Sequence, residues 1–313
     1  MTRKTNLEGI ESAPRWIVMF LGAYLVVDLL VFYLWSAAGQ VFSIQGTTDS
    51  TSALSVTGMA AVDLWLCLVV LRSFPAGAPL RPAWMLFTLA AAARAASGVL
   101  AQLLGTNWLL NPLVWAGHAR SGLIEQIRHC ALIAGGPVRL ALLAAAMLAV
   151  LRIMRRFGFW VRPSATDWAM SGIVGLFTLC RFGEAGAASL AGRPIGLENW
   201  ISLAGLPILC VLFLEAMLLR QSVIRMGNGL LTRGWVALVC GILLTGAGEV
   251  ALWVIPHYSQ TLPLAMFGAL IQLPLAAAFA LVPAYQVAAQ RRAIKPDSSS
   301  PEGLAAGVPA LAR

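Results

Sequence analysis

The sequence predicts an all-α integral membrane protein, a bundle of about eight transmembrane helices that form four tandem helix hairpins. Composition, the length of the apolar segments and an internal repeat predict this fold. The chain of 313 residues is 59% hydrophobic and 11% charged, whereas soluble domains are about 45–50% apolar and about 25% charged. The mean hydropathy of +0.80 agrees. This composition leaves no room for a sizeable soluble domain.

The apolar segments are long enough to cross a bilayer, which takes about 20 mainly apolar residues in a helix. The first segment is longer than the apolar core of about 7–15 residues in a secretory signal peptide and contains Asp28, so we expect it to be retained. Eight segments qualify: 16–38, 55–73, 83–105, 130–153, 168–191, 200–221, 234–255 and 261–286.

The basic residues between the segments predict the orientation. Sixteen Lys and Arg residues flank the spans on the side that holds both termini, and only Arg120, Arg128 and Arg193 lie between spans on the other side. Because excess Lys and Arg marks the cytoplasmic side, both termini are predicted to be cytoplasmic. Of the 22 basic residues 20 are Arg, which is typical of a GC-rich bacterial genome, so the expected location is the inner membrane of a bacterial cell.

This topology divides the chain into three parts. Residues 1–15 form a cytoplasmic N-terminal segment, and residues 16–292 form the transmembrane domain. Residues 293–313 are rich in Pro, Ser and Gly and have no amphipathic period, so they are expected to be a disordered cytoplasmic tail.

A weak repeat supports the hairpins. Four odd-numbered spans begin with a tryptophan, the residue type that favours the membrane interface: Trp16, Trp84, Trp168 and Trp235. Three segments within the spans can be aligned with one another: FTLAAAARAAS (87–97), FTLCRFGEAGA (177–187) and ILLTGAGEVAL (242–252). In this alignment Arg94, Glu184 and Glu249 occupy the same position. Three even-numbered spans share a proline, at Pro137, Pro207 and Pro274. Four hairpins inserted the same way round explain the pattern; chance similarity between Ala/Leu-rich helices is the alternative.

Charged residues inside the spans are the candidate functional residues, because such residues usually face the bundle interior or a wet cavity. Arg181 and Glu184 are spaced i, i+3 and can touch on one helix face. At 1.5 Å per residue, the charges of several spans reach similar depths. We expect one cluster, either a packing network or a polar pocket open to the outside, that contains Arg94, Arg139, Arg181, Glu184 and Glu249.

Two further acids lie in apolar segments. Asp63, in AVDLWLC, is a candidate site for a proton or a cation, with packing as the alternative. Glu215, five residues before Arg220, is interpreted as a packing or interfacial residue. The outer segment 106–130 is apolar enough to rest on the membrane, and a lid over the pocket is its functional alternative.

The sequence lacks the residues that several classes of function require. The net charge of +9 is spread between apolar runs and not over one solvated face, so no nucleic-acid partner is expected. The five cysteines form no CxxC motif, and His118, His129 and His257 have no metal-ligand spacing. Phosphate-binding glycine motifs are absent. We therefore expect no cofactor, no metal and no catalytic residues, and a membrane enzyme is left open only as a minor alternative.

Transport of a small polar or ionic solute is the function these residues favour, with coupling to protons through Asp63, Glu184 or Glu249. A membrane sensor that binds a ligand in the same pocket is one alternative. That sensor would signal through a protein partner at the Arg-rich cytoplasmic face, since the sequence after residue 292 holds no output domain. A structural subunit of a membrane complex is the other alternative. The partners expected in every case are the lipid bilayer and, for the first two, a small polar or ionic ligand.

Overall fold

The computed structural model shows a chain whose regular structure is helical throughout its described part. It describes residues 12–37, 45–104, 126, 129–131, 133–159, 162–192, 196–225, 229–258 and 263–294. The helices are α1 (Ala13–Ala37), α2 (Gln45–Ser73), α3 (Arg81–Leu104), the π-helix η2 (Ala134–Val138), α6 (Arg139–Arg156), α7 (Ala165–Leu190), α8 (Leu197–Arg225), α9 (Leu230–Tyr258) and α10 (Pro263–Ile294).

Seven candidate spans in the described part of the chain are helices long and apolar enough to cross a membrane, which indicates a multi-pass membrane protein. In α1 the apolar stretch is described over Ala13–Val27, and most side chains beyond it lie outside the described part of the chain. The count of eight spans therefore stays a prediction. The seven candidate spans are Ser55–Ser73, Arg81–Leu100, His129–Arg156, Ala165–Leu190, Asn199–Val223, Leu230–Val250 and Leu273–Arg291.

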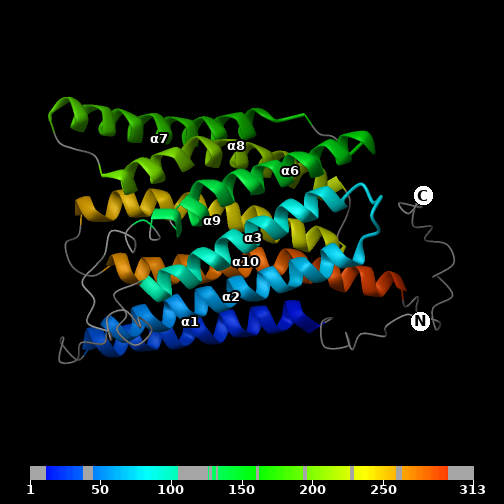
Figure 1. Ribbon diagram of the computed structural model, residues 1–313, viewed down its shortest axis with the longest axis horizontal. Helices are drawn as coiled ribbons and strands as arrows, with labels where there is room; N and C mark the ends of the chain where they lie inside the picture. The colour runs from blue at the N-terminus through cyan, green and yellow to red at the C-terminus, as the bar shows by residue number, and fades with distance from the viewer. Residues whose placement is uncertain are drawn as a thin grey trace.

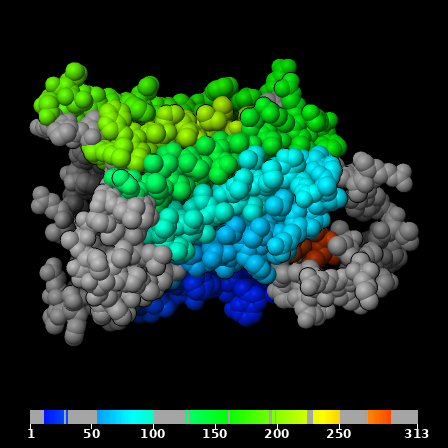
Figure 2. All heavy atoms as spheres, in the orientation of Figure 1, coloured from blue at the N-terminus to red at the C-terminus, as the bar shows by residue number. Residues whose placement is uncertain are grey.

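The long helices run side by side, with α7 at one edge of the bundle and α1 at the opposite edge (Figure 1). Helix α10 packs against α9, α2 and α1, while α3 packs against α2 and α6. Helix α8 packs against α6, α7 and α9. The visible face in Figure 2 is formed by α2 and α3 in blue and cyan and by the green helices α6 to α8. Consecutive helices of three expected hairpins are in contact, α3 with α6, α7 with α8 and α9 with α10, although the hairpin repeat itself stays a prediction.

The helix ends that carry basic residues lie together at one end of the bundle. Helix α1 begins there and α10 ends there, as do α2, α6 and α8, while α3, α7 and α9 begin there (Figure 1). We call this the Arg-rich end. The basic residues at or next to these helix ends in the sequence are Arg15, Arg72, Arg81, Arg152, Arg155, Arg156, Arg162, Arg220, Arg225, Arg233 and Arg291.

The four tryptophans that begin the odd-numbered spans differ in burial. Trp16 and Trp168 are exposed, as interfacial residues would be, but Trp84 and Trp235 are 1% and 6% exposed. Their rings meet through Phe87, with centroids 5.4 Å from Trp84 to Phe87 and 6.3 Å from Phe87 to Trp235. Trp84 and Trp235 therefore join α3 to α9 inside the protein. Their burial concerns contacts with other helices and not depth in a membrane, so the expected interfacial position stays a prediction.

A capping box begins α7 and fastens it to α8. Ser164 Oγ accepts a hydrogen bond from the Asp167 backbone N–H at 3.2 Å, and the Ser164 backbone N–H donates to Asp167 Oδ2 at 2.7 Å. Gln221 of α8 donates a further hydrogen bond to the same carboxylate oxygen. Asp167 is buried as a result. A local helix-start signal thus also serves as a contact between two helices.

Candidate functional site

A cavity of about 440 Å³, partly open to the outside of the protein, lies between the helices. It is lined by residues of α2, α3, η2, α6, α8 and α9. Its volume lies within the range of about 300–1,000 Å³ that is typical of small-molecule sites. Its charged lining residues are Arg94, Arg139 and Glu249, and its hydroxyl groups come from Thr57, Ser97 and Ser202.

The cavity lies well away from the Arg-rich end. Arg94 is 13 residues after Arg81, the first residue of α3, which corresponds to about 20 Å along the helix. Glu249 is 19 residues after Leu230, the first residue of α9, or about 28 Å along the helix. The cavity therefore occupies the half of the bundle remote from the Arg-rich end.

The π-helix places Arg139 in the cavity wall. Residues Ala134–Val138 carry the GGP sequence, and Arg139 follows directly as the first residue of α6. A Cβ added to Gly135 would lie 2.2 Å from Ser97 Oγ and 2.9 Å from Ser97 Cβ, so only glycine fits against α3 here. π-Helical turns often mark functional sites. The GGP sequence thus lies in the segment where η2 packs against α3 and leads into α6.

Arg94 and Arg139 share one aromatic ring. The guanidinium carbon of Arg139 lies 4.7 Å from the centroid of Phe279 in α10, and that of Arg94 lies 5.7 Å from the same centroid. Both distances are within the range of about 6 Å for cation–π attraction. Phe279 was not a candidate from the sequence, since nothing distinguishes it from other aromatic residues in apolar helices. Only the fold shows that two arginines approach it.

Both arginines are buried with unused donors. Each is 8% exposed, and Arg94 Nη1 and Arg139 Nη2 are buried atoms without a hydrogen-bond partner in the described structure. Among the described residues, neither arginine forms an ion pair with Asp63 or Glu249 within salt-bridge distance. A buried donor left unpaired costs about 1–3 kcal/mol, and more when it is charged. The site therefore holds positive charge that its own side chains do not fully satisfy.

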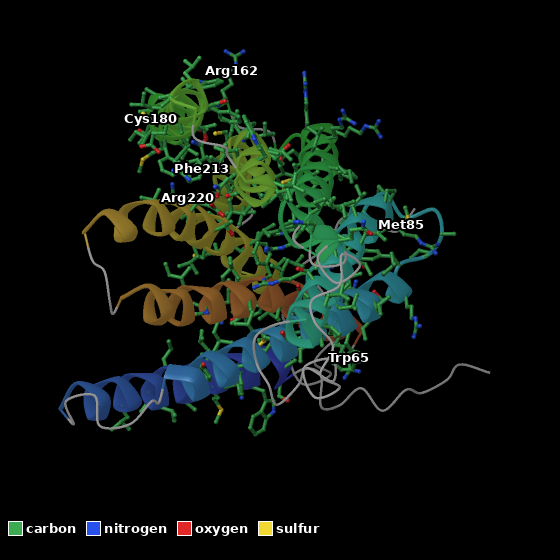
Figure 3. The ribbon with its side chains drawn as sticks, turned by 60° about the vertical axis from the view of Figure 1, so that its left-hand side comes forward. Trp65, Met85, Arg162, Cys180, Phe213 and Arg220 are labelled. Atoms are coloured by element: carbon green, nitrogen blue, oxygen red, sulfur yellow. The ribbon has the colours of Figure 1, made fainter. Side chains whose placement is uncertain are left out.

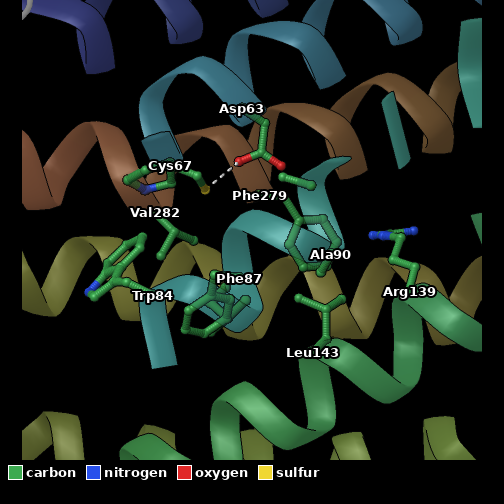
Figure 4. Close-up of a pocket in the computed structure, with 12 residues that line it drawn as sticks. Asp63, Cys67, Trp84, Phe87, Ala90, Arg139, Leu143, Phe279 and Val282 are labelled. Carbon is green, nitrogen blue, oxygen red and sulfur yellow. Dashed lines mark hydrogen bonds between the residues drawn. The ribbon is translucent and has the colours of Figure 1, made fainter. Parts of the chain in front are cut away.

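Asp63 is the acid that faces these two arginines. It is 6% exposed, and its electrostatic interactions are with Arg94 and Arg139. Cys67, one turn further along α2, donates a hydrogen bond from its thiol to Asp63 Oδ1 at 3.6 Å. Figure 4 shows this bond as a dashed line, with Phe279 and Arg139 beside it. Asp63 thus supplies the nearby negative charge at a distance longer than an ion pair.

A second, smaller cavity lies between Asp63 and Trp84. It has a volume of about 20 Å³, and Arg139 lines both cavities. A volume of this size holds about one water molecule. Apolar side chains make up most of its wall, as Figure 4 shows for Trp84, Phe87, Leu143 and Val282. This apolar layer lies between the large cavity and the Arg-rich end.

Glu249 lines the cavity from α9. Its carboxylate interacts electrostatically with Arg181, and no described arginine forms an ion pair with it. It is therefore a cavity-facing acid and not the fixed partner of a buried cation. Glu215 lies elsewhere in α8, where it is buried and its Oε2 has no partner in the described structure.

Arg181 and Glu184 are in contact, as the spacing predicts, but neither of them lines the large cavity. Arg181 Nη1 lies 3.0 Å from Glu184 Oε2, and the two side chains are 31% and 46% exposed. Helix α7 packs against α8 and is exposed along most of its length, and Figure 3 also shows it, with Cys180, at the edge of the bundle. Similar depth in the membrane therefore did not place this pair in the cavity with Arg94 and Arg139.

Some expectations lie outside the described residues. These are the side chain of Asp28, most of the outer segment 106–130 and the segments 1–11 and 295–313. Within the described residues, no group of three His, Cys, Asp or Glu side chains could hold a metal ion.

Comparison with known proteins gives no functional assignment. No protein-family model matches the chain, and no curated protein or solved structure matches it. The residues of the large cavity are therefore the basis on which a function can be argued.

Proposed function

We propose that the chain transports a small polar or ionic solute across the inner membrane of a bacterial cell. One observation carries this proposal: a cavity of about 440 Å³ between membrane-compatible helices, lined by Arg94, Arg139 and Glu249. Buried ionisable groups are expensive in a membrane and usually mark solute or ion pathways. A chain that needed only packing could fill this space with apolar side chains.

The proposed route enters the cavity from the outer side. With both termini cytoplasmic, the Arg-rich end lies inside the cell and the cavity lies in the outer half of the bundle. The apolar layer that includes Trp84, Phe87 and Val282 is then the inner barrier. Transport requires this layer to open after the solute has bound, while the outer half closes.

Glu249 is the proposed proton carrier. It lines the same cavity as the arginines and has no ion-pair partner among the described residues. Its charge therefore changes the potential that a bound solute experiences. Asp63 lines the small cavity and not the large one. We propose that its negative charge offsets part of the positive charge of the two arginines. Glu184, paired with Arg181 on the exposed side of α7, is not part of this route.

The two alternatives make different demands on the cavity. A sensor needs ligand binding in the cavity without flux, and a protein partner at the Arg-rich end. A structural subunit needs charges that are satisfied by one another, which does not fit the unpartnered donors of Arg94 and Arg139. The site therefore supports a solute-binding function over a purely structural one.

Flux in reconstituted protein tests the proposal. Proteoliposomes would be given inward gradients of gluconate, glycine or choline, which are an anion, a zwitterion and a cation of low passive permeability. Uptake and internal pH would be recorded together. We expect uptake of one charge class above that of empty liposomes, with a change of internal pH that Glu249→Gln removes. No uptake of any class would contradict transport, and binding without uptake would favour the sensor.

A further inference from the structure

The geometry points to a more specific ligand: we infer that the cavity binds a small organic anion through its carboxylate, held by Arg94 and Arg139. The inference rests on the proposed function, since it names the solute class that the transporting cavity accepts. It goes beyond that function because a polar cavity in a membrane bundle can equally well select cations or zwitterions.

The unused donors favour an oxyanion. Arg94 Nη1 and Arg139 Nη2 are buried and unpartnered, and both side chains line the cavity. A guanidinium group carries only donors, in a planar fork that matches the two oxygens of a carboxylate. Neither unpartnered atom is accessible to solvent in the structure, so a ligand that offers acceptors to both forks removes the cost of the unpaired donors once the guanidinium groups turn these atoms toward the cavity that they line. A cation or a neutral amide does not provide this match.

The charge balance favours a single negative charge. Arg94 and Arg139 together carry two positive charges, and Asp63 is the acid with which both interact. These three groups sum to one positive charge, which a monoanion neutralises. Glu249 lies in the wall of the same cavity and brings this sum to zero when it is ionised, so a monoanion is neutralised while Glu249, the proposed proton carrier, is protonated. A monocarboxylate therefore fits better than a dianion.

The size and lining favour an organic anion over a bare inorganic ion. The cavity of about 440 Å³ is larger than a carboxylate needs. Beyond the arginines its wall offers the hydroxyl groups of Ser97 and Ser202 and apolar side chains such as Leu140 and Leu206. Such a wall accommodates the body of an organic acid, with its carboxylate at the two guanidinium groups.

The Phe279 ring keeps this site assembled in the absence of ligand. Its centroid lies 5.7 Å from the Arg94 guanidinium carbon and 4.7 Å from that of Arg139. Two like charges brought close together repel each other, and the shared ring offsets part of that repulsion. The arginines are therefore held near one another before a ligand arrives, which lowers the cost of binding.

Three isosteric probes test the charge preference directly. Benzoate, benzamide and benzamidinium have nearly the same shape and carry a negative, a neutral and a positive group. Calorimetric titration would use the full chain in nanodiscs of zwitterionic lipid, with inorganic phosphate as a fourth probe. We expect benzoate to bind at least tenfold more tightly than each of the others. Equal or tighter binding of benzamide or benzamidinium, or no binding of benzoate, would overturn the inference; tighter phosphate binding would overturn the organic class.

Matched variants locate the binding. Arg94→Gln and Arg139→Gln should each weaken benzoate binding at least tenfold, whereas Arg152→Gln, on an exposed part of the same helix as Arg139, should leave it unchanged. The melting temperature of the two cavity variants should stay level or rise, because an unsatisfied buried charge is removed. A melting temperature that falls while benzoate affinity is retained would identify packing arginines and overturn the inference.

A chemical-modification experiment on the unaltered chain tests the site even if the variants do not fold. Phenylglyoxal modifies accessible arginines, and mass spectrometry can report Arg94 and Arg139 separately from Arg152. Benzoate should slow modification of the first two and not of the third; equal modification with and without benzoate would contradict the site. The outcomes of the binding and uptake experiments also distinguish the anion site from the transport function. Benzoate binding without uptake of any gradient contradicts transport alone, whereas choline uptake without benzoate binding contradicts the anion site alone.

Discussion

The guanidinium group of Arg139 lies over the ring of Phe279, with its central carbon 4.7 Å from the ring centroid. Because Arg94 approaches the same ring, one aromatic residue supports both cations of the cavity. Phe279 is buried, and its helix packs against both α2 and α9. The ring is thus a fixed point around which the charged side chains of separate helices are arranged.

Replacing this ring should reduce stability more than replacing an ordinary core phenylalanine. Phe279→Leu removes buried area and two cation–π contacts, each worth about 0.5–2 kcal/mol. We expect it to lower the free energy of unfolding by about 1–2 kcal/mol more than Phe213→Leu, a buried control outside the cavity. Equilibrium unfolding in mixed detergent measures both values. Equal losses would show that the arginines gain nothing from the ring.

The close approach of η2 to α3 gives a second test with an internal control. Gly135→Ala would place a Cβ 2.2 Å from Ser97 Oγ, whereas a Cβ at the neighbouring Gly136 meets nothing within 4 Å. We expect Gly135→Ala to destabilise the protein by about 1–3 kcal/mol and to weaken benzoate binding, because Arg139 moves with the π-helix. Gly136→Ala should change both values little. A thermal-unfolding and titration series compares the pair, and similar behaviour of the two variants would contradict the tight contact.

The contact between α7 and α8 can be tested at its capping box. Asp167→Asn keeps the shape of the side chain but weakens its acceptance of hydrogen bonds from Ser164 and Gln221. Asp167 is the third helical residue of the capping box, and the expected loss is about 0.5–1.5 kcal/mol, the net value of a typical hydrogen bond. Protease accessibility of α7 should rise, and a double-mutant cycle with Gln221→Ala should show coupling between the two residues. Additive losses would mean that Gln221 does not hold α7 to the bundle.

The orientation can be tested with two engineered cysteines. Gly77→Cys lies between α2 and α3 at the Arg-rich end, and Gly196→Cys lies between α7 and α8 at the opposite end. In a chain whose five native cysteines are replaced by Ala, a membrane-impermeant maleimide should label residue 196 on intact cells. Residue 77 should react only after lysis. The reverse pattern would invert the orientation, and labelling of both from outside would contradict the number of crossings between them.

Grouping the charged residues by depth brought together some residues of one cavity but not all of the residues that were grouped. Arg94, Arg139 and Glu249 were grouped because they reach similar depths, and the structure brings them into one cavity wall. Glu184 fits the same depth, yet its helix lies at the edge of the bundle. Rise per residue gives depth along the membrane normal. It carries no information about which helices are neighbours.

Residues whose roles depend on tertiary contacts could not be identified from the sequence. Phe279 is one of twelve phenylalanines, and only the packing of α10 brings two arginines to it. Trp84 and Trp235 were expected at the membrane interface, and only the fold shows that other helices bury them. Nothing in the sequence distinguished Gly135 from the other glycines. Its requirement for glycine comes from Ser97, 38 residues earlier in the chain.

Asp63 provides the last test, in which stability and affinity should change in opposite directions. Asp63→Asn keeps the size of the side chain and removes the negative charge that interacts with Arg94 and Arg139. Two buried cations are then left without their nearby counter-charge. The free energy of unfolding should fall by about 1–3 kcal/mol, less than the 3–5 kcal/mol typical of a buried pair in direct contact.

Benzoate should at the same time bind more tightly to Asp63→Asn, because the cavity gains one unit of positive charge and the ligand becomes the main anion near the arginines. Titration and thermal unfolding of the same preparation measure the two effects. Cys67→Ala is the matched control, since it removes the hydrogen bond to Asp63 Oδ1 but keeps the charge; it should alter affinity little. Weaker benzoate binding in Asp63→Asn would show that Asp63 positions the arginines for the ligand. Unchanged binding would show that its charge does not reach the site. Either result would contradict the charge balance on which a monoanion was inferred.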